Sequence, residues 1–168
     1  MTLDIAIDAD GEWDSSSGWD ELARAAANAA IAESAFPQLG SSERAVELSI
    51  RLTSDAEVHA LNAEWRGKDK PTNVLSFPMA EADDLAETTA PGPELMLGDI
   101  ILARGVCAAE AAEKAIPIES HAAHLMIHGT LHLLGYDHMD EGSAADMEAR
   151  EVRALARLGI ANPYEAAV

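Results

Sequence analysis

The chain is poor in cysteine and has no long apolar stretch. Its one cysteine, Cys107, excludes an internal disulfide and fits a reducing cytoplasm. It has no run of about 18 apolar residues, which a membrane-spanning helix would need. The first five residues lack the positive region and apolar core of a signal peptide. These absences predict a cytoplasmic protein without membrane association.

Basic residues are also scarce, since 11 Lys and Arg stand against 30 Asp and Glu, for a net charge of −19. Nucleic-acid binders usually carry a basic face, because much of their affinity comes from neutralising phosphates. The composition therefore argues against a broad nucleic-acid surface. However, Arg66, Lys68 and Lys70 lie close together in the sequence. They predict a small basic patch on an acidic body, and only weak, salt-sensitive binding of nucleic acid.

The 168 residues, of which 48% are hydrophobic, predict one domain, residues 1–168, with a proper core. Short apolar or alternating stretches predict strands at 3–7, 45–52, 72–77 and 97–102. Apolar spacing and end signals predict helices at 19–35, 54–65, 103–115, 119–134 and 142–158. The acidic segment 81–93, which contains Pro-Gly-Pro, is predicted to be a long mobile loop. The fold class is therefore α+β, a mixed α/β domain with four strands and about five helices.

Three histidines near the end of the helix predicted at 119–134 stand four and then six residues apart. His128 and His132 share one helical face. Gly135 is a residue type that ends helices, so the chain can reverse there and bring His138 back to the same point. Three imidazoles around an ion that keeps an open position are typical of a catalytic metal site, most often zinc.

His124 extends the same stripe, but it cannot join His128 and His132 on one metal ion. The eight residues from His124 to His132 span about 12 Å of helix, which is too far for bonds of about 2 Å. The pair next to the turn, His128 and His132, is therefore predicted to bind the metal. His124 is expected outside the ligand set, either supporting a ligand or in the core, and His121 in the first turn of the helix.

The segment 128–138 reads H-G-T-L-H-L-L-G-Y-D-H, and it resembles the motif H-G-x-L-H-L-x-G-Y-D-H of the YbeY family of bacterial metal-dependent endoribonucleases. Segments 66–78 and 97–100 are similar to two further signatures of that family. The resemblance implies a mixed four-stranded sheet surrounded by helices, with a metal helix like that of the zincins. It also implies single-strand-specific cleavage of RNA in maturation of the 3′ end of 16S rRNA, ribosome biogenesis and quality control.

Carried over residue by residue, the resemblance implies metal ligands at His128, His132 and His138, with Arg66 and His128 as catalytic residues. One Zn²⁺ per chain would lower the pKa of its bound water to about 7. The guanidinium of Arg66 suits phosphate, which it can bind through two parallel hydrogen bonds. The implied partners are single-stranded RNA of the small ribosomal subunit and a ribosomal protein or assembly GTPase.

Two other functions compete with RNA cleavage. The histidine spacing matches the metzincin peptidase pattern H-E-x-x-H-x-x-G-x-x-H, but Gly129 replaces the glutamate that serves as general base there. A ribosome-assembly factor with a purely structural metal is the second alternative, and an open three-histidine site beside Arg66 argues against it.

The roles of Asp99 and Asp137 stay open: Asp99 could bond the metal helix or line the cleft, and Asp137 could orient an imidazole or cap the loop.

Overall fold

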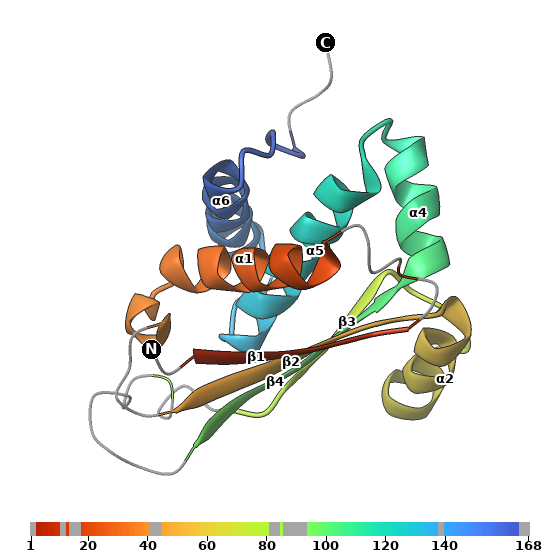
Figure 1. Ribbon diagram of the computed structural model, residues 1–168, viewed down its shortest axis with the longest axis horizontal. Helices are drawn as coiled ribbons and strands as arrows, with labels where there is room; N and C mark the ends of the chain where they lie inside the picture. The colour runs from red at the N-terminus through yellow and green to blue at the C-terminus, as the bar shows by residue number, and fades with distance from the viewer. Residues whose placement is uncertain are drawn as a thin grey trace.

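The protein is built on a four-stranded mixed sheet (Figure 1), seen in a computed structural model that describes residues 3–10, 13, 18–40, 45–80, 85, 94–137 and 140–164. The strands are β1 (Leu3–Ala9), β2 (Val46–Thr53), β3 (Val74–Pro78) and β4 (Leu95–Ala103). Their order across the sheet is β1-β2-β4-β3. Strands β1, β2 and β4 are parallel to one another, whereas β3 runs antiparallel to β4 and forms one edge of the sheet.

Within the described residues five bounded α-helices surround this sheet, where the sequence predicted about five. They are α1 (Trp19–Ala32), α2 (Asp55–Arg66), α4 (Arg104–Glu113), α5 (Ile118–Leu133) and α6 (Glu141–Arg157), and a short 3₁₀ helix, η2, spans Pro37–Gly40. Helices α1 and α5 cover one face of the sheet and α6 packs against both of them, while α2 lies on the other face (Figure 1). The α+β prediction is confirmed. The loop predicted at 81–93 lies outside the described residues, except for Leu85.

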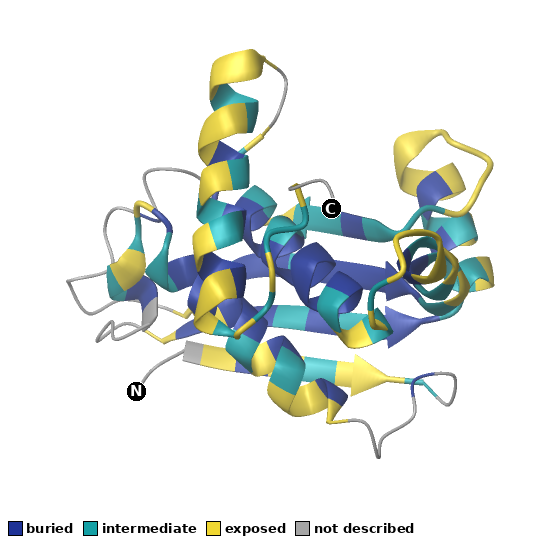
Figure 2. Cartoon of the chain, turned by 90° about the horizontal axis from the view of Figure 1, so that it is seen from above, coloured by how far each residue is buried: buried dark blue, intermediate teal, exposed yellow. Residues whose placement is uncertain are grey.

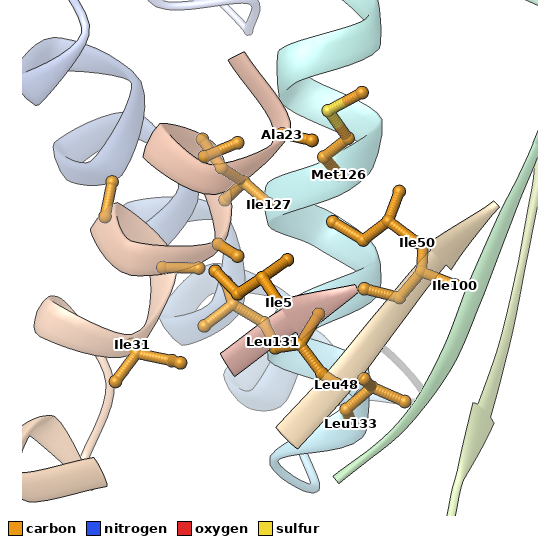
Figure 3. Close-up of a cluster of buried hydrophobic side chains, with 14 of the residues drawn as sticks. Ile5, Ala23, Ile31, Leu48, Ile50, Ile100, Met126, Ile127, Leu131 and Leu133 are labelled. Atoms are coloured by element: carbon orange, nitrogen blue, oxygen red, sulfur yellow. The ribbon is translucent and has the colours of Figure 1, made fainter. Parts of the chain in front are cut away.

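Helix α5 is the centre of the core. Figure 3 shows Ile127 and Leu131 of α5 among side chains from β1, β2 and β4. In Figure 2 the central strands are mostly dark blue, whereas the helices are yellow on the sides that face away from the sheet. Gly129 permits a close approach, because a Cβ atom there would lie 2.8 Å from a methyl group of Ile100. Helix α5 is thus held against β4 by close packing, which fixes every side chain that it carries.

Helix α2 begins and ends largely as its sequence predicts. Ser54 caps it by accepting a hydrogen bond of 3.2 Å from the backbone N–H of Glu57, and Gly67 ends it with a φ of 67°. Ser54 and Glu57 have the spacing of a capping box, in which the Glu57 side chain would bond back to the N–H of Ser54. Another contact replaces that second bond. The carboxylate of Glu57 turns to β2, where it accepts hydrogen bonds from Arg51 and Thr53.

Cys107 lies in the core, with none of its surface exposed. Burial raises the pKa of its thiol to about 12, so the nucleophilic thiolate is disfavoured at neutral pH. None of the helices within the described residues is long and apolar enough to cross a membrane.

Candidate active site

The last two turns of α5 bring His128 and His132 side by side. Their Nε2 atoms lie 2.9 Å apart, and both side chains are partly buried. The helix ends immediately afterwards, where Gly135 has a φ of 94°. The turn is closed by a 3.1 Å hydrogen bond from the N–H of Tyr136 to the carbonyl of Leu131. The predicted pairing on one helical face and the helix end at Gly135 are therefore both present.

Both imidazoles are oriented through their Nδ1 atoms. His128 Nδ1 lies 3.0 Å from a carboxylate oxygen of Glu151, and His132 Nδ1 lies 2.8 Å from the carbonyl oxygen of Tyr136. A carbonyl and an ionised carboxylate only accept hydrogen bonds, so each Nδ1 is the donor. In the neutral rings the two Nε2 atoms then carry lone pairs directed toward each other.

This pair of nitrogens fits a metal ion. Two lone pairs 2.9 Å apart repel each other unless a cation or a proton lies between them. Nitrogen ligands bind zinc at about 2.0–2.1 Å, so two of them on one ion can be at most about 4.2 Å apart. The observed separation of the two Nε2 atoms is within that limit. Hydrogen bonds from Nδ1 to fixed oxygens are also typical of histidines that bind metals.

The third predicted ligand, His138, lies outside the described residues, and its role stays a prediction. Among the side chains that the structure does describe, no group of three histidines, cysteines or carboxylates is placed to hold one metal ion. The complete ligand set therefore depends on His138.

Glu151 of α6 is a site residue that the sequence reasoning missed. Its carboxylate is buried, with 1% of the residue exposed, and it joins His128 to His124, whose Nε2 lies 2.7 Å from the other oxygen. The hydroxyl of Tyr164 bonds to that same oxygen. Burial disfavours the charged form of Glu151, but its hydrogen bonds with His124, His128 and Tyr164 together outweigh burial and lower the pKa to about 2. Glu151 is therefore an anion at neutral pH.

The other two histidines of α5 each contact a glutamate on a neighbouring helix. His124 contacts Glu151, and His121, in the first turn of α5, lies 2.8 Å from a carboxylate oxygen of Glu110 on α4. Both residues are buried. His124 thus supports a predicted ligand through a shared carboxylate and does not face the His128–His132 pair.

Arg66 and the histidine pair line the same cleft. The cleft has a volume of about 610 Å³ and is lined by Arg66, by β3 with the residues before it, and by His128 and His132. The guanidinium of Arg66 donates a 2.6 Å hydrogen bond to the carbonyl of Ser76 and lies 5.4 Å from the centre of the Phe77 ring. Lys68 and Lys70 are exposed nearby in the sequence. The cleft therefore combines a positioned cation with paired imidazoles, an arrangement suited to a phosphodiester.

Asp99 occupies a different face of the sheet. Ile100 contacts α5 at Gly129, and successive residues of a strand point to opposite faces. Asp99 therefore points to the face covered by α2, which argues against a bond between Asp99 and the metal helix. The role of the exposed Asp137 stays open.

Comparisons with known proteins show which proteins this chain resembles in sequence and in fold. A family model described as Endoribonuclease YbeY matches residues 12–159. An Endoribonuclease YbeY from Sphingopyxis alaskensis is 52% identical over 164 residues, covering 96% of this chain and 97% of the relative. One from Zymomonas mobilis is 47% identical, covering 96% and 93%. The solution structure of a Thermotoga maritima protein matches the fold with a TM-score of 0.55 at 23% identity, covering 96% of this chain and 99% of that one.

Proposed function

Because this chain belongs to the YbeY family of endoribonucleases, we propose that it cleaves single-stranded RNA using one Zn²⁺ ion bound by His128, His132 and His138. The observation that carries the proposal is the shared cleft, which is lined by Arg66 and by the histidine pair whose Nε2 atoms lie close together. A phosphodiester in that cleft has a guanidinium on one side and metal-binding nitrogens on the other.

Different residues of the chain have different roles in the proposed cleavage. Arg66 binds the phosphate and offsets the negative charge that builds up as the bond to phosphorus is attacked. Glu151 and the carbonyl of Tyr136 hold the two imidazoles in the tautomer that presents Nε2. A zinc ion bound there would supply a water of pKa about 7, and hence hydroxide near neutral pH.

The substrate that we propose is ribosomal RNA of the small subunit, at the 3′ end of 16S rRNA, in the cytoplasm. Maturation of ribosomal RNA is the general role of the family. The charge of −19 also supports a substrate within a larger particle, because this body repels free RNA at long range. A ribosomal protein or assembly GTPase that holds the protein near an exposed strand would overcome that repulsion.

Replacing Arg66 with alanine is expected to lower the rate of RNA cleavage by about 100-fold, the usual effect of removing one donor that stabilises a developing negative charge. Metal content and the unfolding midpoint should change little, because the side chain is exposed. Lysine at this position should restore only part of the rate, since it lacks the planar fork of the guanidinium.

The matched control is Arg24→Ala. Arg24 is also exposed and donates a 2.8 Å hydrogen bond to a strand carbonyl, that of Ile5, but it lies on α1. Its loss should leave cleavage unchanged. Equal rates for the parent and Arg66→Ala would show that Arg66 has only a structural role.

Binding of a short single strand should depend only weakly on salt. The basic segment Arg66–Lys70 offers three cations, so two or three phosphates can be neutralised. At about 0.7 per phosphate for single strands, the slope of log affinity against log salt concentration should be near −2. Fluorescence anisotropy across a salt series measures the slope. A slope near −6, or a preference for duplex RNA, would place the RNA surface elsewhere.

Peptide hydrolysis is disfavoured by the packing of Gly129. The glutamate of the metzincin pattern would occupy this position, where an added Cβ atom would lie only 2.8 Å from a methyl group of Ile100. A side chain at residue 129 would therefore press into β4 instead of reaching the cleft, so the chain has no general base at that position.

A further inference from the structure

A second hollow adjoins the cleft and shares Asn73, Val74 and His128 with it. It has a volume of about 200 Å³, and its far wall is made by Glu110 of α4, by Lys114, which directly follows α4, and by Tyr164, which follows α6. An RNA strand whose phosphate lies between Arg66 and His128 would therefore have a neighbouring nucleotide at this hollow.

Tyr164 presents an aromatic ring beside His128. The residue is 46% exposed, although its hydroxyl bonds to Glu151 and lies 3.0 Å from His124 Nε2. Its exposed surface is thus largely carbon. An edge-to-face contact with the ring of His124, 5.4 Å between centres, also fixes its orientation. Bases of single-stranded RNA stack on such exposed rings, and a ring held in place in advance loses little freedom when it binds.

Glu110 presents a carboxylate in the same hollow. One oxygen, Oε1, accepts a 3.0 Å hydrogen bond from the amide of Asn73 and lies 2.8 Å from Nε2 of His121. The side chain remains 34% exposed. A fixed carboxylate repels a phosphate group but accepts hydrogen bonds from the amino group of a base, as it does from N4 of cytosine. The hollow therefore suits a base better than a phosphate.

We propose that this hollow binds the nucleobase next to the cleaved phosphate, with the base stacked on Tyr164 and its amino group donating to Glu110. The proposal rests on the RNA-cleaving function proposed above and adds a preference to it. Adenine, cytosine and guanine carry amino groups. Uracil has no amino group, and its two carbonyl oxygens, on either side of its one N–H, repel the oxygens of the carboxylate because both groups are hydrogen-bond acceptors.

The stacking part is tested by the affinity for a short single-stranded oligonucleotide of cytidines, measured by anisotropy with a chelator present so that cleavage does not interfere. Tyr164→Leu is expected to weaken binding by about 5- to 150-fold, the range for loss of one base–aromatic stack. Tyr164→Phe keeps the ring and should bind like the parent. Trp65→Leu removes another exposed aromatic ring, 65% exposed on α2, and serves as the control that should not change binding. Equal weakening in the Phe and Leu variants would overturn stacking, because the hydroxyl would then be what matters.

The preference for an amino group is tested with metal-loaded protein and oligonucleotides that differ only by cytosine or uracil beside the cleaved bond. The parent should cleave the cytosine substrate faster, and Glu110→Gln should remove most of the difference, since an amide can also donate to uracil. Glu113→Gln makes the same charge change at an exposed position of α4 and should keep the preference. Equal rates on both substrates for the parent would overturn the proposal while leaving RNA cleavage intact. A parent that binds the strands but cleaves neither would instead contradict the proposed function, and the affinities would still decide the subsite.

Discussion

Replacing His132 with alanine is expected to abolish RNA cleavage and to weaken metal binding by more than about 100-fold, because loss of even an outer hydrogen bond to a metal ligand costs about 10- to 100-fold. The variant should fold, since the side chain is only partly buried. The hydrogen bond that it loses from Nδ1 to the Tyr136 carbonyl lies at the end of the helix. Metal content by mass spectrometry, together with cleavage of a labelled single strand, measures both effects.

His59→Ala is the matched control for this variant. The side chain of His59, on α2, is 41% exposed and contacts Asp69 at 2.7 Å, so its loss removes an imidazole far in sequence from the histidine pair. Metal content and rate should stay at the level of the parent. If His132→Ala retained a full complement of metal and the parent rate, the histidine pair would not be the metal site. Chelation of the parent, followed by return of Zn²⁺ or another divalent ion, identifies the metal that restores cleavage.

Replacing Glu151 with glutamine should lower metal affinity and cleavage by about 10- to 100-fold, although Glu151 is not a predicted ligand. A carboxylate accepts from His128 and from His124 at once, whereas an amide has only one accepting end. One buried donor is then left without an acceptor, which costs about 1–3 kcal/mol of folding free energy. Glu151→Ala should be worse, because both imidazoles lose their contact with this carboxylate and a cavity remains.

The control for Glu151 is Glu141→Gln, an exposed glutamate in the first turn of the same helix. It should change the unfolding free energy by less than about 1 kcal/mol, the usual limit for a charge near a helix end. Urea unfolding separates the contribution to stability from the contribution to metal affinity. A Glu151→Gln protein with parent metal affinity would show that the carboxylate serves only the core.

The parts of the site predicted from sequence are those close together in the chain. His128 and His132 share a helical face because residues four apart always do, and Gly135 signals the end of that helix. Glu151 was missed because it lies on another helix and belongs to no local pattern. A signal was nevertheless present: Glu151 lies on the apolar stripe of α6, among the buried residues Met147, Ala154 and Leu155. A charge on such a stripe needs a buried partner.

The fold was predictable for a similar reason, since each strand and helix carries its own periodicity and end signals. The capping box at Ser54 shows where prediction from local sequence patterns fails. Its spacing correctly predicts the start of α2, yet Glu57 turns away to Arg51 on β2, a partner that only the packed sheet provides. Local patterns predicted the elements here, whereas contacts between elements required the structure.

The bridge from Glu151 to His128 also sets the order in which activity can arise during translation. The ribosome makes α5 before α6, at about 5–20 residues per second, so for a short time the nascent chain carries the histidines without the carboxylate that orients one of them. The oriented imidazole exists only after α6 has been synthesised and has packed against α5. A site arranged in this way is complete only after both helices have formed and have packed together.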